Sequence, residues 1–414
     1  MWAVCISMSR ADFGPHRNGT ISPQLEGSVS RSEDGGLHAG EAVRPYIGGQ
    51  AVLEGVMMRA PKSFAVVVRR RDGSLIVRER RMPERATGIS RFPLVRGVLS
   101  LVESLRLGSE ALKFSADEFE KDLGLETAAG GFVSLLGAVG LSLWSAITRD
   151  ERSILPAPSR TRSNSGLWVM LGVAITVFVA LPQAVAAGVN RALGMGLELQ
   201  EPRFQAMTGV FKLTIVIGYL LAIRLIPDIR RVFQYHGAEH KTITTYEAGE
   251  PLTVEAARTK TTLHPRCGTT FLVMIVFVSI LVFAGMGAAL PRIHTGSRLL
   301  DNILFFLEKL PFLPLIAAIT FELQRVIART CQTGPLRLLL WPGFLVQKIT
   351  TAEPTDEQLE VALASLRVTL FRQNGAERDA ESSDARFSDY AELVAADGLQ
   401  SNVSTAVVPA AVVP

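Results

Sequence analysis

The sequence predicts a mainly α-helical membrane protein with about four transmembrane helices, one weaker hydrophobic segment and a small cytoplasmic unit that contains a β-hairpin. Hydrophobic residues make up 48% of its 414 residues, charged residues only 20%, and the mean hydropathy is +0.27. A soluble domain usually carries about 25% charged residues, and here the excess apolar content lies in a few long uncharged runs. The apolar fraction excludes a disordered chain, and the presence of only three cysteines excludes a disulfide scaffold.

Three runs are candidate spans of an ordinary kind. Residues 166–189 and 269–290 contain no charged residue, and each is long enough to cross a hydrocarbon core of about 30 Å. Residues 206–227 also qualify, although they contain Lys212 and Arg224. We expect these two long side chains to reach the lipid headgroups.

Two further runs are less regular. Residues 303–321 contain Glu308, Lys309 and two prolines, which predicts a broken or interfacial start followed by a span. Residues 127–148 are uncharged but rich in glycine and serine, and they predict a weak, re-entrant or surface-lying helix. The number of spans, four or five, depends on this last segment.

The distribution of basic residues favours four spans. Arginine and lysine are abundant in residues 45–126 and 228–268, and such residues near span ends favour the cytoplasmic side. Both segments are cytoplasmic only if an even number of spans separates them. We therefore expect residues 127–148 not to cross, and a multi-pass protein of a bacterial cytoplasmic (inner) membrane with both termini inside. Reversed topology with five spans is the alternative.

The rest of the chain divides around this membrane domain. In order, we expect a disordered leader (1–44), a cytoplasmic β-unit with a basic amphipathic helix (45–126), the membrane domain with its cytoplasmic metal-site loop at 228–268 (127–330), a cytoplasmic C-terminal segment and helix (331–373), and a disordered acidic tail (374–414). The first residues lack the basic start and apolar run of a secretory signal.

Two runs rich in valine and isoleucine, 64–70 and 74–80, flank Asp72-Gly73, which is a strong short-range signal for a β-hairpin. Residues 46–59 favour another strand or a loop followed by a strand. Leucines at helical spacing in residues 89–114, with arginines elsewhere, predict a basic amphipathic helix. It either lies on the membrane surface or packs on the hairpin.

A further helix is expected near residue 356. Thr355 and Gln358 fit a capping box, in which a threonine N-cap is followed three residues later by glutamine. The leucines that follow form one helical stripe, which predicts a face that docks on the β-unit.

Residues with the chemistry of a metal site lie in the loop 228–268. His236 and His240 share one face of a helix, because they are four residues apart, and so could bind one metal ion. Glu239 precedes the second histidine, where metal hydrolases with an H-x-x-E-H pattern keep a general base. The pattern is short, and Gly237 within it weakens a helix.

His264 and Cys267 form a second pair in the same loop, and imidazole and thiolate are accepted zinc ligands. The four side chains predict a divalent-metal site, with Zn²⁺ as the best match. Four protein ligands would make a closed structural site, whereas three would leave a position open for catalysis. Two alternatives remain: simple hydrogen bonding and packing of these residues, and a nucleophilic Cys267 activated by a histidine.

Four blocks in this order resemble the YqhQ-like family of bacterial multi-spanning membrane proteins, which have a domain of unknown function and are described as predicted metal-dependent enzymes. The blocks are YIGGQAVLEGVMMRAP (46–61), RVFQYHGAEHKTI (231–243), LHPRCGTTF (263–271) and PGFLVQKITTAEPTDEQLEVAL (342–363). The resemblance implies an inner-membrane protein whose metal site includes His236, Glu239, His240, His264 and Cys267. It also marks residues 127–148, the leader and the tail as additions to the family pattern.

Three other polar residues are candidates for function. Glu54 lies among apolar residues of the first block, and Glu322 ends an apolar run, where ionisable groups usually face a bundle interior. Arg266, between two candidate ligands, could bind an anionic group. For each of the three, an ordinary ion pair is an equally good interpretation.

Three functions remain open. The first is a metal-dependent hydrolase at the cytoplasmic face, in which Glu239 is the catalytic base and the substrate, a peptide or a lipid phosphoester, is associated with the membrane. The second is a non-enzymatic scaffold or biogenesis factor that binds an unknown protein partner and contains a structural zinc site. The third is a transporter that uses Glu322. The expected partners include anionic lipid headgroups and exclude nucleic acid, because no aromatic residues alternate with the arginines.

Overall fold

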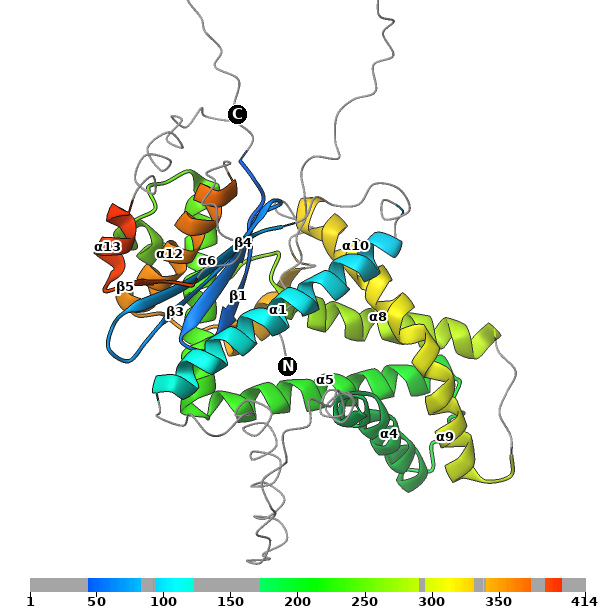
Figure 1. Cartoon of the computed structure of the whole chain (residues 1–414). Coiled ribbons are helices and arrows are strands. Elements are labelled where there is room, and N and C mark those ends of the chain that lie inside the picture. The colour runs from blue at the N-terminus through cyan, green and yellow to red at the C-terminus, as the bar shows by residue number, and fades with distance from the viewer. Residues whose placement is uncertain are drawn as a thin grey trace, which may run out of the picture.

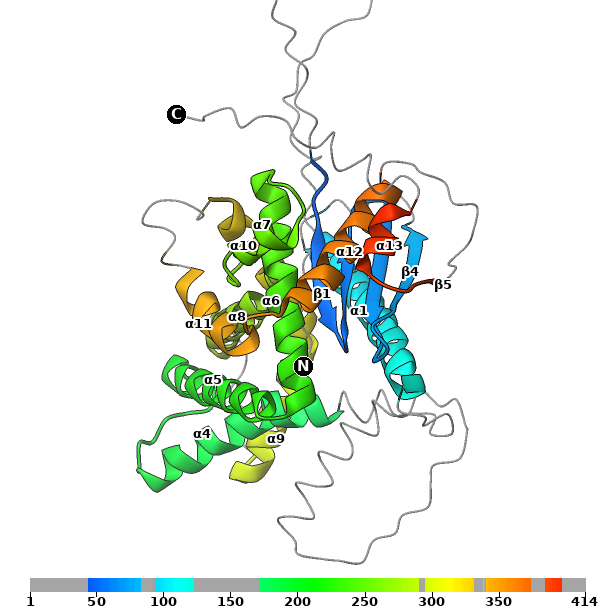
Figure 2. The same cartoon turned by 90° about the vertical axis from the view of Figure 1, so that its left-hand side faces the viewer.

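The structure is a computed structural model that describes residues 44–82, 92, 94–122, 172–289, 295–330, 338, 340–373 and 384–396. The described strands form one five-stranded antiparallel sheet in the order β1-β2-β3-β4-β5. Their bounds are Gly48–Val52 (β1), Gly55–Arg59 (β2), Ser63–Arg69 (β3), Leu75–Arg81 (β4) and Asp384–Phe387 (β5). Figures 1 and 2 show this sheet between helices, at one end of a helical bundle.

The predicted hairpin is confirmed. Arg69 pairs with Leu75, the amide of Arg70 donates to Ser74 O at 2.8 Å, and Gly73 adopts a φ of 89°. Only glycine adopts that backbone conformation without strain, which explains the Asp-Gly turn. The hairpin is one part of a longer meander, because β1 and β2 precede it.

Both faces of the sheet are apolar and buried. Met57, Phe64 and Val66 face helix α1 (Val95–Asp122), whereas Met58, Ala65 and Val67 face the opposite side. On that side lie α6 (Pro227–Ala248) and α12 (Asp356–Gln373). Because successive side chains of a strand point to opposite faces, a sheet covered on both sides needs the nearly continuous apolar run seen in β3.

The C-terminal helix docks as its leucine stripe predicts. Leu359, Leu363 and Leu366 are fully buried against the sheet and α6, and Gln358 accepts a hydrogen bond from the backbone amide of Thr355 at 2.9 Å, as in a capping box. The expected tail differs from the structure, since residues 384–396 form β5 and a short helix, α13 (Tyr390–Ala395). Leu393 of α13 is buried in the same core, so this part of the tail is an element of the fold.

Helix α1 packs on the sheet, which is one of the two alternatives that its sequence left open. In its C-terminal half, Leu107, Ala111 and Phe114 pack on the sheet. Its N-terminal half packs on α10 (Leu313–Thr330), where Gly97 lies against Ala318. The apolar residues on the other side of that half are exposed; they are Val95, Leu99, Val102 and Leu105. The alternative of a helix on a membrane surface stays a prediction.

Four helical runs of the described chain are long and apolar enough to cross a membrane, namely Gly172–Ala192, Pro202–Arg224, Gly268–Gly287 and Arg298–Ile327. The first contains a π-helical turn, η3 (Thr176–Ala180), before α4 (Leu181–Ala192); the second is α5 (Pro202–Arg224) and the third belongs to α8 (Gly268–Ala289). The last joins α9 (Arg298–Lys309), η4 (Leu310–Phe312) and α10 (Leu313–Thr330). The break at η4 confirms the irregular start predicted for residues 303–321, whereas residues 127–148 lie outside the described residues.

Two short helices complete the end of the bundle that carries the sheet. These are α7 (Val254–Arg258) and α11 (Trp341–Thr350). Arg224, at the end of α5, donates to the carbonyl oxygens of Lys348 and Ile349, so it holds the end of α11 instead of reaching outward. Lys212 also differs from its expectation, because its ammonium group donates to Ser279 on α8 inside the bundle.

Candidate metal centre

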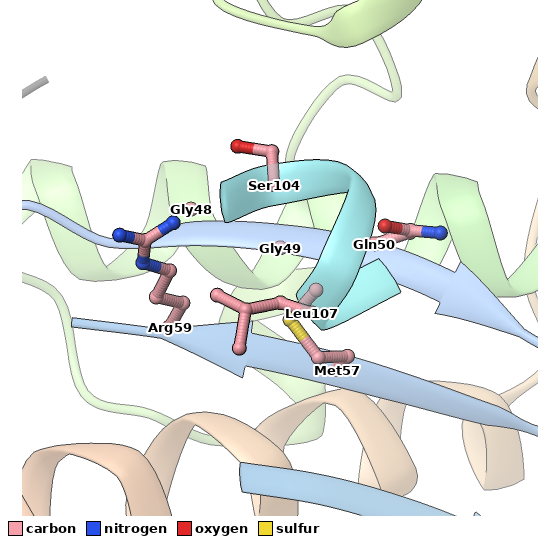
Figure 3. Close-up of a pocket in the computed structure, with 7 residues that line it drawn as sticks. All are labelled: Gly48, Gly49, Gln50, Met57, Arg59, Ser104 and Leu107. Atoms are coloured by element: carbon pink, nitrogen blue, oxygen red, sulfur yellow. The ribbon is translucent and has the colours of Figure 1, made fainter. Parts of the chain in front are cut away.

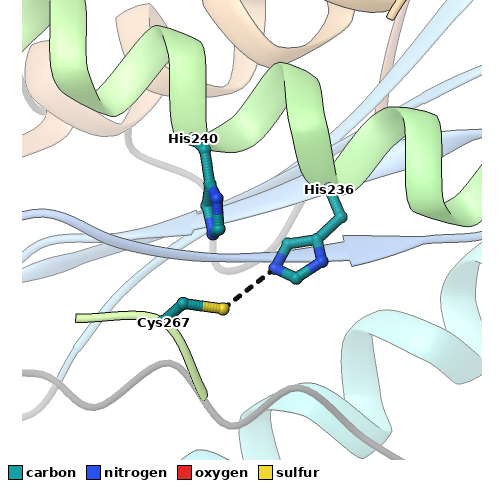
Figure 4. Close-up of side chains that lie close together, drawn as sticks. All are labelled: His236, His240 and Cys267. Atoms are coloured by element: carbon teal, nitrogen blue, oxygen red, sulfur yellow. Dashed lines mark hydrogen bonds between the residues drawn. The ribbon is translucent and has the colours of Figure 1, made fainter. Parts of the chain in front are cut away.

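The HGAEHK block lies on α6, and two of its side chains meet Cys267 at the start of α8. His236, His240 and Cys267 each offer a ligand atom, and these three atoms all lie within 4.8 Å of one another. Figure 4 shows both imidazoles projecting from α6 toward the sulfur, and His236 Nε2 is 3.2 Å from Cys267 Sγ. Three of the four expected ligands are therefore brought together by the fold.

The other nitrogen of each imidazole is held by a backbone carbonyl. His236 Nδ1 lies 2.9 Å from Thr350 O, and His240 Nδ1 lies 2.5 Å from Thr262 O. Because a carbonyl oxygen only accepts, each Nδ1 must carry the proton, and each Nε2 keeps its lone pair for the cluster. The buried Nε2 of His240 has no hydrogen-bond partner among the described residues. Such outer contacts are typical of metal-binding histidines.

Gly237 explains how the carbonyl of Thr350 reaches the site. A Cβ atom at this position would lie 2.1 Å from the carbonyl oxygen of Ala352. The segment after α11 therefore packs directly on the backbone of α6, where the amide of Ala352 donates to Phe233 O at 2.9 Å. The glycine that weakens the helix in the sequence is required by this close approach.

Gln347 of α11 fixes the loop that carries Cys267. Its side chain accepts from the amide of His264 at 2.8 Å and donates to His264 O at 2.8 Å and to Thr270 Oγ1 at 2.9 Å. Gln324 of α10 donates to the carbonyl of Cys267 at 3.1 Å. The cysteine is thus placed by side chains from two helices that are remote in sequence.

His264 lies beside the cluster and outside the group of three. Its ring centre is 5.6 Å from that of His240, whereas the rings of His236 and His240 are 4.4 Å apart. Its Nε2 is 3.4 Å from a carboxylate oxygen of Glu247. His264 therefore adjoins the cluster on the side of His240.

Glu239 is the buried carboxylate of the site. It is 0% exposed, and strand β1 passes over it at Gly49, where a Cβ atom would come within 2.7 Å of Glu239 Cγ. Burial is the main cause of the raised pKa of the Cys267 thiol, and the nearby Glu239 carboxylate contributes in the same direction. The GGQ sequence of the first block therefore makes room for this glutamate.

Burial disfavours the charged forms of His240, His264 and Cys267. Desolvation, with the nearby charge of His236, lowers the pKa of His264 to about 4 and holds the pKa of His240 well below its usual value. Desolvation also raises the pKa of the Cys267 thiol to about 12, despite hydrogen bonds from Thr269 that act in the opposite direction. A thiol with a raised pKa is a poor nucleophile, which disfavours the alternative of a catalytic cysteine.

The other three candidate residues form ion pairs. Glu54 makes a bidentate pair with Arg231 at 2.5 Å, and Glu322 pairs with Arg96 at 2.8 Å. Arg266 pairs with Glu247 and stacks 4.7 Å from the ring centre of Tyr46. The first pair joins the turn between β1 and β2 to α6, the second joins α1 to α10, and the third joins the loop before α8 to α6. The structure therefore favours the ordinary interpretation for all three residues.

A groove of about 610 Å³ opens beside His264. One wall is apolar and belongs to α11, with Trp341, Phe344 and Leu345; the other is polar, with Thr244, Glu247 and His264. A smaller pocket between α1 and strands β1 and β2, lined by Gly49 and Arg59 and shown in Figure 3, measures only about 10 Å³ and holds no more than about one water molecule. Of these two pockets in the described residues, the groove is the one large enough for an organic ligand.

Sequence reasoning missed the residues that hold the ligands. Thr262 and Thr350 act through backbone carbonyls, which leave no sequence signature. Gln347 had a signal, because it lies within the PGFLVQKITT block that carries the family resemblance. A buried amide that caps a neighbouring loop cannot be told from any other glutamine without the tertiary contacts.

Comparison with known proteins supports the resemblance. The chain is 29% identical over 346 residues to a protein of Bacillus subtilis (strain 168) named "Uncharacterized protein YqhQ", and the match covers 79% of this chain and 93% of that protein. No solved structure matches the chain significantly. Residues 92–371 match the model of the family described as "Protein of unknown function (DUF1385)", and this chain belongs to that family.

Proposed function

We propose that this protein is a metal-dependent hydrolase that acts on a membrane-associated substrate at the cytoplasmic face of a bacterial inner membrane. The observation that carries the proposal is the convergence of His236, His240 and Cys267, with both Nε2 lone pairs directed inward. Two imidazoles and a thiolate match the donor set of catalytic zinc sites, which keep three protein ligands and one open position. These three residues would hold a divalent metal, for which Zn²⁺ is the best match.

When bound, zinc in such a site supplies Lewis-acid polarisation of a carbonyl or phosphoryl oxygen. Glu239 provides the proton acceptor. It is buried on α6, the helix that carries His236 and His240, and its carboxylate lies near the Cys267 thiol. A carboxylate in this place can take a proton from an attacking water and return it to the leaving group. His264 lies between His240 and the groove that it lines, where it can orient a substrate oxygen.

The groove indicates an amphiphilic substrate. Its apolar wall is suited to a hydrocarbon chain, and its polar wall leads to His264. Lys348 at its edge provides a positive charge for an anionic headgroup. Trp341 and Leu345 are exposed on α11, as expected for a helix at a membrane interface. A lipid ester, a lipid phosphoester and a membrane peptide all fit this description.

A second function is favoured by the burial of the ligands. His236, His240 and Cys267 are 3%, 1% and 0% exposed, as in a structural zinc site. In that case the metal would fasten the loop before α8 to α6. The sheet with its covering helices α1 and α12 would then serve as a scaffold for a protein partner.

The experiment that separates the two functions starts with metal analysis of the purified protein. About one zinc or other divalent ion per chain is expected, and its absence would contradict both functions. Glu239→Gln should retain the metal and lose hydrolysis of vesicles made from bacterial lipids or of membrane peptides, by about 100-fold or more. The matched control is Glu118→Gln, which changes a buried glutamate of a different helix, α1. Equal turnover in wild type and Glu239→Gln would leave the structural function.

A further inference from the structure

A second buried polar cluster lies inside the bundle, away from the metal centre. Each of the four candidate spans contributes one polar side chain from a position close to its middle: Gln183, Lys212, Ser279 and Lys309. Lys309 Nζ donates to Gln183 Oε1 at 2.8 Å, and Lys212 Nζ donates to Ser279 Oγ at 3.2 Å. The four side chains therefore form one layer across the bundle.

Both ammonium groups face the same aromatic ring. Phe283 of α8 has its ring centre 4.9 Å from Lys309 Nζ and 5.6 Å from Lys212 Nζ. Phe305 of α9 lies 4.4 Å from Lys309 Nζ. Lys309 is 1% exposed. The two ammonium groups thus contact one aromatic ring, whose face supplies only part of the hydration that the buried Lys309 has lost.

Neither lysine forms an ion pair with a carboxylate of the described chain. The buried Oε2 of Glu308, the residue before Lys309, has no hydrogen-bond partner there and does not pair with either lysine. Lys309 uses one of its three N–H donors on Gln183, and the amide of Gln183 is itself fixed by donation to Asn302 O at 2.9 Å. A buried charge without a partner is strongly unfavourable, and ionisable residues within spans usually mark a binding site or pathway.

Two of the four helices are irregular next to this layer. The π-helical turn η3 ends at Ala180, shortly before Gln183, and the 3₁₀ turn η4 begins directly after Lys309. Such interruptions free backbone groups and are frequent at functional sites within helices, including the broken helices of transporters. The irregular turns belong to the two spans whose polar side chains are hydrogen-bonded to each other.

We propose that this layer, termed the lysine layer (Gln183, Lys212, Ser279 and Lys309), binds one small inorganic anion such as chloride or phosphate between the two ammonium groups. The anion supplies the missing negative charge. It also accepts hydrogen bonds from the ammonium N–H groups of Lys309 and Lys212 that do not donate to Gln183 or Ser279. The site does not depend on the proposed hydrolase, since no residue of the layer contacts the metal centre in the described chain.

The test uses the full-length protein in nanodiscs. Radiolabelled chloride or phosphate should bind saturably at about one ion per chain by equilibrium dialysis. The thermal midpoint should rise by several degrees when chloride or phosphate replaces gluconate at constant ionic strength. Lys212→Met and Lys309→Met should weaken binding at least 10-fold and remove the shift, whereas Lys113→Met, which changes an exposed lysine on α1, should retain both.

Three results would overturn the proposal. The first is the absence of saturable binding, and the second is equal binding in wild type and in Lys212→Met, the milder change because Lys212 is only half-buried. The third combines two measurements: the lysine variants lose co-purified anionic lipid, as measured by mass spectrometry, but still bind the free anion. That result would assign the layer to a lipid phosphate. Metal content, measured on the same samples, shows whether each variant is folded.

Discussion

The two buried polar clusters of this protein have opposite chemistry. At the metal centre, backbone carbonyls hold the N–H groups of His236 and His240, so lone pairs converge on the interior. In the lysine layer, Lys212 and Lys309 direct N–H donors into the interior. Both clusters are buried apart from Lys212, which is half-buried, so the direction of donors and acceptors decides which charge each cluster can accept. One cluster suits a cation and the other an anion.

The clusters also differ in how they are built. The metal centre lies where α6, α8 and α11 meet beside the sheet, and its supporting contacts come from backbone and amide groups at fixed positions. The lysine layer is built from side chains of the four candidate spans, with a single hydrogen bond holding each ammonium group in the described residues. We therefore expect the first cluster to be rigid and selective, and the second to adapt to its ligand.

Loss of a ligand should have the largest effect. His236→Ala removes one donor and leaves Cys267 Sγ without its 3.2 Å neighbour. Because even outer contacts of a metal site are worth about 10- to 100-fold in affinity, we expect at least about a 100-fold loss, measured as metal per chain after dialysis. Lys309→Met should keep the metal. If it lost the metal as well, the two clusters would not be independent.

The support from Gln347 should come next. Gln347→Leu keeps the volume and removes three hydrogen bonds, leaving the backbone of His264 unsatisfied, so unfolding should become easier by about 2–4 kcal/mol. Metal affinity should fall by about 10- to 100-fold. Gln358→Leu, which removes the capping contact of α12, is the matched control: it should cost about 1 kcal/mol and keep metal affinity. Equal metal affinity in both variants would show that the loop before α8 is held by other contacts.

The close approach at Gly237 gives a smaller effect. Gly237→Ala forces Ala352 away from α6 and draws Thr350 O off His236 Nδ1, which should destabilise the fold by about 1–3 kcal/mol and reduce bound metal. In Gly188→Ala the new methyl group meets nothing within 4 Å, and helix propensity should leave stability equal or higher. Thermal unfolding of the two variants measures the difference. A stable, fully metallated Gly237→Ala protein would contradict the tight packing of α6.

The smallest effect concerns the pairing of β5. The Arg78 guanidinium lowers the pKa of Asp384, so the pair stabilises the fold above the unfolded pKa of about 4 and loses its effect as pH falls through the lower folded value. Both side chains are about a third or more exposed, and Asp384→Asn should cost no more than about 0.5 kcal/mol at pH 7. Urea denaturation at pH 7 and at pH 3 measures the change. A difference that grows toward acid pH would contradict this role.

Local signals in the sequence identified the elements and most of the candidate ligands. The Asp72-Gly73 turn, the capping pair at Thr355 and the break after Lys309 are each confirmed, because they depend on residues adjacent in the chain. The pairing of β5 with β4 joins segments some 300 residues apart, and no local pattern predicts it. The ion pair between Glu322 and Arg96 of α1 also joins residues that are far apart in the chain, so no local pattern predicts it.

The amino-acid sequence alone determined the apolar spans, the alternation of the strands and the family, because these follow from residue type and spacing. Only the tertiary structure decided which side chains share a site. It placed Cys267 against His236 and moved His264 to the edge, and it turned Lys212 from the expected headgroup region into the bundle. The physical reason is that a ligand set or a buried charge depends on distances and burial between separate elements, which packing sets and local sequence does not.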